Sequence, residues 1–212
     1  MNRHVVYNGT MCFSNNITYS RVKRLFPHSL NFDIIRFFHG SNVKVPSPSL
    51  DRCKEGRDLG RRFYTTKNER QAQDFAEYIT NRLGKGVATV NEYEFDDDIL
   101  KDPRYTTLNL GNAPTEEWVN HLILNRLKGD FNVLPEYLRF VDEKKMGRYL
   151  INPPSLTIGL VADGKPDEIL EDYLHGKISL DETIERLNPN LKKEQWAFGD
   201  QSLLNKFKYI KK

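Results

Sequence analysis

The sequence contains few cysteines and no long apolar run. Its 212 residues include two cysteines, Cys12 and Cys53, which are too few for a disulfide framework and lie in no zinc-site spacing. We therefore expect reduced thiols. No apolar stretch approaches the ~20 residues of a membrane-spanning helix, and the N-terminus lacks the apolar segment of a Sec signal peptide. The sequence predicts a soluble protein with no membrane partner, either cytoplasmic or exported by another bacterial route to act in a host cytosol.

The chain also lacks a large excess of either positive or negative charge. The chain has 32 Lys and Arg residues against 29 Asp and Glu residues, a net charge of +3, and the excess is spread along its length. A dedicated nucleic-acid binder concentrates basic residues on one face, so there is no clear nucleic-acid signal. The five histidines are scattered, and no Gly-rich phosphate loop or Rossmann fingerprint occurs. We expect no metal site.

The composition is that of a folded globular protein. Hydrophobic residues make up 38% of the chain and aromatic residues 11%, too rich in Phe and Tyr for a disordered chain. We expect a domain over residues 31–212. Residues 1–30 are rich in Asn, Ser and Thr and form a leader in our interpretation. Two alternatives stay open for this leader: a flexible terminus, or a secretion signal of the kind that bacterial effectors carry.

The expected elements do not alternate regularly between strand and helix, which favours a mixed α+β fold over a doubly wound sheet. Runs of β-formers predict strands, and apolar residues at helical spacing predict helices. The spacing of a capping box precedes two helices, at Thr66 with Glu69 and at Ser179 with Glu182. The expected strands are 34–38, 63–66, 87–95, 156–162, 195–198 and 206–210, and the expected helices are 69–83, 115–128, 166–175 and 179–187.

Three short segments suggest a chemistry. They are 38–41 (Phe-His-Gly-Ser), 59–66 (Leu-Gly-Arg-Arg-Phe-Tyr-Thr-Thr) and 194–198 (Glu-Gln-Trp-Ala-Phe). Their order resembles the ADP-ribosyltransferases of the diphtheria-toxin and poly(ADP-ribose) polymerase type, which carry His-Gly on one strand, Gly-x-x-Tyr opening a strand-helix unit, and Glu or Gln before an aromatic residue on a late strand. More closely, residues 35–210 resemble a bacterial domain family of uncharacterised proteins related to that fold.

This resemblance implies an α+β fold, a split antiparallel β-sandwich with flanking helices, with NAD bound in its cleft. Taken singly, each motif residue also has a structural alternative, as a core side chain or an exposed strand position. The residues that the resemblance marks as catalytic are Gln195, His39 and Tyr64, and those that it marks as binding NAD are His39, Gly40, Ser41, Tyr64 and Phe75.

These residue types suit NAD cleavage. The Tyr64 ring would stack on the flat nicotinamide, with a stabilisation of about 0.5–1.5 kcal/mol beyond area burial, and Phe75, on the expected inward face of its helix, would supply a second ring. Gly40 has no Cβ, so its backbone N–H and C=O can approach the nicotinamide carboxamide. The His39 imidazole can bond a ribose hydroxyl.

Gln195 departs from the common pattern of the resembled enzymes. Most of them carry Glu here, whose carboxylate orients the ribose and offsets the positive charge that grows as the bond breaks. Gln keeps the hydrogen-bond geometry without the charge. Glu194 is adjacent, but alternation along a strand points it to the opposite face. We therefore assign the catalytic position to Gln195 and keep Glu194 as the reserve.

Further charged residues flank the motifs. Arg52, Arg57, Arg61 and Arg62 lie where an NAD pyrophosphate would need cations, although a solvated basic loop explains most of them. Asp163 follows an apolar strand, where it could orient a catalytic group or cap the next turn, and we expect the cap.

The resulting hypothesis is a mono-ADP-ribosyltransferase, a bacterial toxin or virulence effector that uses NAD as substrate. The acceptor would be a protein, with a Ser or Thr hydroxyl favoured because the Glu-x-Glu pattern of arginine modification is missing, and a host protein such as ubiquitin is one candidate. Two alternatives stay open. One is a non-catalytic NAD- or ADP-ribose-binding module, and the other is an NAD hydrolase or a nucleic-acid ADP-ribosyltransferase.

Overall fold

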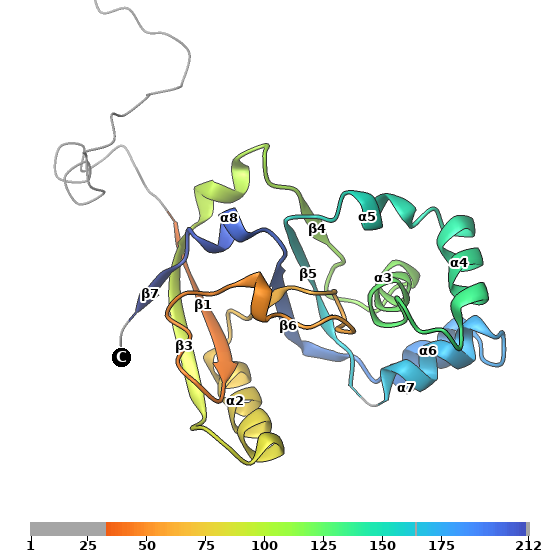
Figure 1. Cartoon of the computed structure of the whole chain (residues 1–212), viewed down its shortest axis with the longest axis horizontal. Helices are drawn as coiled ribbons and strands as arrows, with labels where there is room; N and C mark the ends of the chain where they lie inside the picture. Colours follow the sequence, from red (N-terminus) through yellow and green to blue (C-terminus); the bar gives the residue numbers. More distant parts are fainter. Residues whose placement is uncertain (1–32, 164, 211–212) are drawn as a thin grey trace, which may run out of the picture. The chain divides into compact units, whose positions relative to one another are not determined.

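The protein has a mixed α+β fold built around two sheets (Figure 1). A computed structural model describes residues 33–163 and 165–210; the predicted leader at 1–30, with Cys12, lies outside these residues. In the first sheet, β1 and β7 flank β3, and all neighbours are antiparallel. Its strands are β1 (Ile34–Ser41), β3 (Thr89–Asp96) and β7 (Lys208–Ile210).

The second sheet has the order β2-β6-β5-β4. Strand β4 pairs in parallel with β5, so the expectation of an antiparallel sandwich is wrong at this edge. The sequence analysis also did not predict β4. The other neighbours in this sheet are antiparallel, as expected. The strands are β2 (Phe63–Thr65), β4 (Thr107–Asn109), β5 (Leu156–Val161) and β6 (Asn190–Phe198).

One bridge joins the two sheets. Phe38 of β1 and Thr66, just after β2, exchange both backbone hydrogen bonds, with N···O distances of 2.8 and 2.9 Å. The next carbonyl of β2 that faces β1 is that of Tyr64, and it bonds the His39 ring instead of continuing the ladder. The sheets therefore separate immediately after the bridge, which is where the His-Gly motif lies.

The second sheet is covered on both faces. Between the two sheets, aromatic rings pack on one another; the Phe37 ring, for example, lies 5.2 Å from that of Trp196. The other face packs against a group of helices, which Figure 1 shows together on the far side of β4, β5 and β6. These helices are α3 (Glu116–Arg126), α4 (Leu134–Glu143), α5 (Gly147–Ile151), α6 (Pro166–Leu174) and α7 (Leu180–Leu187). We call the two sides the inter-sheet face and the helical face.

Helix α2 (Glu69–Leu83) matches its predicted bounds but not its predicted cap. The Asn68 side chain accepts the hydrogen bond from the Gln71 N–H, while the Thr66 hydroxyl accepts from the Asn68 N–H and donates to the Gln71 side chain. The capping box predicted at Thr66 is therefore wrong. At α7, in contrast, Ser179 caps the helix as predicted, accepting from the Glu182 N–H.

Gly40 lets α2 lie directly on β1. A Cβ at this position would lie 2.1 Å from the carbonyl oxygen of Ala72 and 2.9 Å from the nitrogen of Ala76. Both alanines are fully buried against the strand. Phe75, in contrast, is 52% exposed, so its expected place on the inward face of the helix is wrong. Small side chains form the contact because β1 and α2 approach so closely.

We expect Gly40→Ala to destabilise the fold by about 3 kcal/mol, because the clashing atoms are backbone atoms that move only with the whole helix. Urea unfolding measures the effect. Gly147→Ala is the control, since a Cβ there meets only a Val141 methyl group at 4.0 Å. Equal free energies of unfolding for Gly40→Ala and the wild type would contradict the close contact between α2 and β1.

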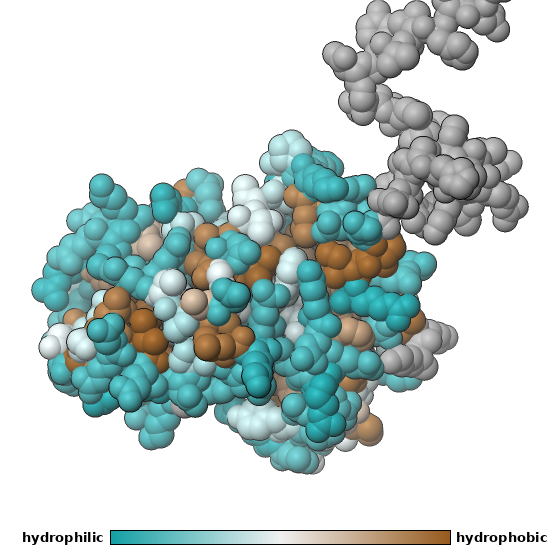
Figure 2. Space-filling view, turned by 180° about the vertical axis from the view of Figure 1, so that it is seen from behind, coloured by the Kyte–Doolittle hydropathy of each residue, from teal (hydrophilic) through white to brown (hydrophobic). Residues whose placement is uncertain are grey.

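The remaining described elements are short, and none of the helices in the described part is long and apolar enough to cross a bilayer. On the face seen in Figure 2, hydrophobic surface occurs in patches among hydrophilic residues. The short elements are the 3-10 helices Leu50–Arg52 and Asp97–Lys101 and the helix α8 (Gln201–Leu204).

Candidate functional site

The site residues on β2 and β6 divide between the two faces of the second sheet. Phe63 and Trp196 lie on the inter-sheet face, within the aromatic core. Their neighbours in the sequence, Tyr64 and Gln195, point to the helical face because side chains alternate along a strand. Glu194 shares a face with Trp196, whose indole Nε1 donates a 2.5 Å hydrogen bond to the Glu194 carboxylate. The expectation that Glu194 and Gln195 point to opposite faces is confirmed.

His39 is on β1 of the first sheet, and its ring points toward the inter-sheet face of the second sheet. Its ring centroid is 4.4 Å from that of Phe63, and its Nδ1 is 2.8 Å from the Tyr64 carbonyl oxygen. Because a carbonyl only accepts, Nδ1 carries the hydrogen and Nε2 carries the lone pair. Burial lowers the pKa of His39 from 6.5, so the ring is neutral at neutral pH. Its Nε2 can therefore accept a hydrogen bond from a ligand hydroxyl.

Gly40 presents an unpaired strand edge. Phe38 uses its N–H and C=O on Thr66, so alternation along β1 turns the N–H and C=O of Gly40 to the same edge, away from β3. No described residue bonds either group. Gly40 is buried, and a buried backbone donor and acceptor without partners are costly. A ligand with one acceptor and one donor side by side would satisfy both.

Glu194 is exposed but held in place. Besides the indole bond to its carboxylate, its backbone carbonyl accepts a 3.1 Å hydrogen bond from the Gln71 side chain of α2. Gln71 in turn accepts from the Thr66 hydroxyl beside the inter-sheet bridge. The Lys67 ammonium lies 4.0 Å from the centroid of the Trp196 ring. This end of β6 is therefore fixed against β2 and α2, close to the bridge.

Gln195 belongs to a buried polar network on the helical face. Its Nε2 donates to Asp58 Oδ2 at 3.1 Å and to the Leu160 carbonyl at 3.0 Å. Asp58 also accepts from the Ala162 N–H at 3.1 Å and pairs with Arg126 at 2.7 Å. An amide donates to a carboxylate, whereas a Glu at position 195 would place two carboxylates together. The network thus gives a structural reason for Gln at this position.

Tyr64 is fixed in the same region. Its hydroxyl donates to the Gly60 carbonyl at 2.7 Å and accepts from the Leu59 N–H at 3.0 Å. Burial, assisted by the nearby Asp58 charge, raises the pKa of this hydroxyl far above its usual value. The Tyr64 ring lies on the helical face. The β2 residue whose ring contacts His39 is Phe63. The structure does not bring the Tyr64 ring beside the His39 ring. The hydroxyl, to which the sequence analysis gave no role, fixes Tyr64 to the loop before β2.

The other predicted site residues lie at or near the surface. Ser41 is half-buried, and its hydroxyl accepts from the Val43 N–H. The exposed Phe75 ring lies 6.2 Å from that of Tyr78, also on α2. Asp163 does not cap helix α6, whose N-cap is Lys165 and which has no side-chain cap.

The four arginines of the loop do not form one cationic cluster. Arg52, Arg57 and Arg61 are exposed, and Arg61 donates to the Cys53 carbonyl. Arg62 is buried and bonds two backbone carbonyls. Within residues 33–163 and 165–210, no three His, Cys, Asp or Glu side chains are grouped as metal ligands.

Residues 35–209 match the model of a family described as "Protein of unknown function (DUF3990)". The chain belongs to this family. The DUF3990 match begins within β1 and ends within β7, so it includes both sheets and every site residue described above. No curated protein and no solved structure is significantly similar to the chain.

The sequence analysis of this DUF3990 member missed the acidic residue that organises the helical face. Asp58 is 6% exposed and joins the loop before β2 to β6, to α3 and to Ala162, the residue after β5. Its hydrogen-bond and ion-pair partners are distant in the sequence, so no local residue spacing predicts these contacts. The one sequence signal for Asp58 is its position directly before the segment 59–66, which contains Tyr64.

Proposed function

We propose that this chain is an NAD-dependent mono-ADP-ribosyltransferase whose site lies on the inter-sheet face, next to the bridge between β1 and β2. The observation that carries the proposal is that the N–H and C=O of Gly40, a buried residue, have no partner among the described residues and lie beside the neutral His39 ring. A primary carboxamide such as that of nicotinamide offers one acceptor and one donor at the spacing of a strand edge. Its binding would satisfy both backbone groups.

The neighbouring residues suit the rest of the reaction. A ribose hydroxyl would donate to His39 Nε2, and the Glu194 carboxylate would offset the positive charge that develops as the bond lengthens. The C–N bond between ribose and nicotinamide breaks, and nicotinamide leaves with the electron pair as a neutral molecule. The acceptor oxygen then bonds the ribose carbon and loses its proton to solvent or to Glu194.

This proposal moves the catalytic role from the Gln195 amide to the Glu194 carboxylate. The amide nitrogen of Gln195 is engaged by Asp58 and Leu160, whereas the exposed Glu194 shares the inter-sheet face with His39. Only a carboxylate supplies charge for the oxocarbenium-like centre. In this proposal Gln195 positions the strand that carries Glu194. A catalytic role of Gln195 is the rival prediction.

The proposed acceptor is a hydroxyl side chain of a protein, with a host protein such as ubiquitin as one candidate. Hydrolysis is the second candidate function, because the exposed carboxylate of Glu194 leaves water able to reach the same centre. The test is incubation of the full chain with labelled NAD, with and without a host-cell lysate. Labelled protein supports transfer, and free ADP-ribose supports hydrolysis. Labelled nucleic acid would redirect the acceptor, and no nicotinamide release would overturn both enzymatic functions.

We expect His39→Ala to weaken NAD use by about 0.5–1.5 kcal/mol in kcat/KM, or about 2- to 12-fold, because a neutral hydrogen bond to the ribose is lost. His39→Gln is the matched variant, since its side chain can still bond the hydroxyl. Nicotinamide release measured at several NAD concentrations gives kcat and KM for each variant. Unchanged kcat/KM in a folded His39→Ala protein would remove His39 from the site.

A further inference from the structure

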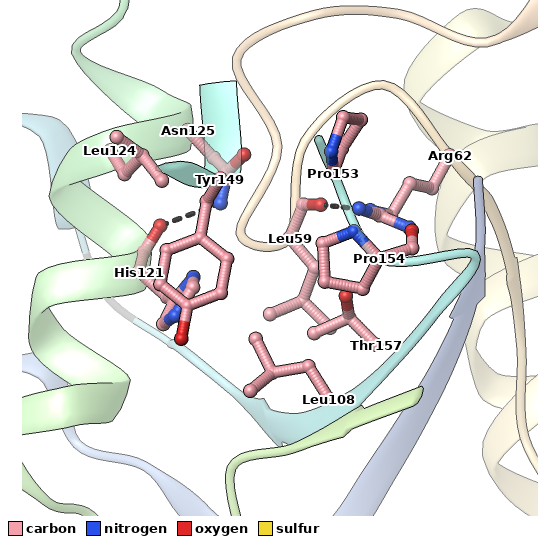
Figure 3. A pocket seen from close by; sticks show the side chains of 10 residues that line it. All are labelled: Leu59, Arg62, Leu108, His121, Leu124, Asn125, Tyr149, Pro153, Pro154 and Thr157. Atoms are coloured by element: carbon pink, nitrogen blue, oxygen red, sulfur yellow. Dashed lines mark hydrogen bonds between the residues drawn. The ribbon is translucent and has the colours of Figure 1, made fainter. Parts of the chain in front are cut away.

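A small cavity lies on the helical face of the second sheet, between α3, α5 and the loop before β2. Its volume is about 30 Å³. Figure 3 shows His121 and Tyr149 on one side of it, Arg62 and Pro154 on the other, and Thr157 below. None of the described residues that line it is acidic. The proposed NAD site is separate, because it lies on the other face of the second sheet.

Arg62 brings a buried positive charge to this cavity. Arg62 is 8% exposed, and its guanidinium donates at 2.7 Å to the carbonyls of Leu59 and Pro154. It forms no ion pair with any residue that the structure describes. A guanidinium keeps its proton in proteins, and an uncompensated buried ion is costly. The two carbonyls use only part of its five N–H groups, so donors remain for another partner.

His121 contributes an unused ring nitrogen. The side chain is 3% exposed, and its Nε2 is buried without a hydrogen-bond partner among the described residues. Burial, together with the Arg62 and Arg148 charges, lowers its pKa to about 4. Its ring contacts that of Tyr149, with centroids 4.5 Å apart. At neutral pH His121 is therefore neutral and adds no charge, and Nε2 can donate when it carries the ring hydrogen.

We propose that this cavity is a binding site for one small monovalent anion of about the size of chloride. The volume holds one or two water-sized particles and is too small for a sulfate or phosphate group. Arg62 supplies the charge and a donor, and His121 supplies a second donor through Nε2. Water alone would fill the space but would leave the Arg62 charge unbalanced. The site ties the loop that carries Arg62 to the segment that carries Pro154.

Bromide tests the proposal, because it resembles chloride and is visible by anomalous scattering. Crystals of the full chain grown with bromide should show one anomalous peak in the cavity, within hydrogen-bond distance of Arg62 and His121. In solution, the melting temperature should rise by about 3–5 °C when bromide reaches about ten times its dissociation constant, relative to sulfate at equal ionic strength.

His121→Phe is the matched variant, since the ring still packs on Tyr149 while Nε2 is removed. We expect it to fold and to lose about half or more of the bromide-specific rise in melting temperature. The Thr157→Val variant keeps both proposed donors and should keep the rise. An ordered water without an anomalous peak, or the same rise with sulfate, would overturn the proposal. An unchanged rise in His121→Phe would do the same for the donor role of His121.

Discussion

Replacing Glu194 by Gln is expected to lower the rate of nicotinamide release by about 10²–10³, the scale for losing one preorganised electrostatic contact in a transition state. The substitution removes the charge and keeps the shape. A Gln side chain can still accept the hydrogen bond that the Trp196 indole now donates to Glu194. The loss should therefore fall on kcat while NAD affinity, measured by calorimetry, changes little.

Two comparisons isolate this effect. Lys192→Gln changes an exposed residue of the same strand and should leave turnover as in the wild type. Gln195→Ala tests the rival assignment. If Glu194→Gln keeps full turnover and Gln195→Ala loses it with the fold intact, the catalytic role belongs to Gln195 as the sequence resemblance implied.

The Asp58→Ala substitution should cost about 3–5 kcal/mol of folding free energy, the largest stability effect that we expect in this chain. Asp58 is the buried partner of Arg126, and its loss would leave that guanidinium, only 15% exposed, with one exposed carboxylate. The Ala162 N–H and the Gln195 amide would also lose their acceptor. Buried donors without an acceptor further lower the free energy of unfolding.

The same arginine supplies the control. Arg126 also pairs at 2.8 Å with Asp167, whose side chain is 62% exposed. Because exposed ion pairs are worth about 0–1 kcal/mol, Asp167→Ala should change the free energy of unfolding by no more than that. Urea denaturation of both variants gives the comparison. Similar losses for Asp58→Ala and Asp167→Ala would refute the buried network as a source of stability.

Local patterns were enough to predict the main strands and several helices. Helix α2 was predicted with its observed bounds because Ala72, Ile79 and neighbouring apolar residues recur at helical spacing. The α+β class followed from the irregular order of elements. Strand β1 continues to Ser41 rather than ending before His39, because the pairing of this segment with β3 outweighs its polar side chains.

Other elements had no such signal. Helices α4 and α5 and strand β4 were not predicted; α5 and β4 are short, and β4 forms through its pairing with β5. The face that each site residue occupies was equally hidden. Tyr64 and Gln195 were grouped with His39 because all three match one motif pattern, yet a shift of one residue along a strand reverses the face. Only the pairing of β2 with β6 and the ring contact of Phe63 with His39 reveal the division.

The two buried histidines make the folded protein a weaker proton acceptor than its own unfolded chain. Burial lowers the pKa of His39 from 6.5 and that of His121 to about 4. Their contribution to stability is complete above pH 6.5 and is lost as the pH falls toward the lower folded values. For His121 the slope reaches about 1.4 kcal/mol per pH unit between pH 6.5 and about 4, and His39 adds to it in the same direction.

Unfolding free energies measured from pH 7.5 to about 4 should therefore decline below 6.5, and His121→Phe should reduce the slope. A flat profile would contradict the burial of both rings. Because the folded pKa of His39 lies below 6.5, nicotinamide release should show no inflection at 6.5. Mild acid would thus lower the population of folded molecules before it changes the chemistry of those that stay folded.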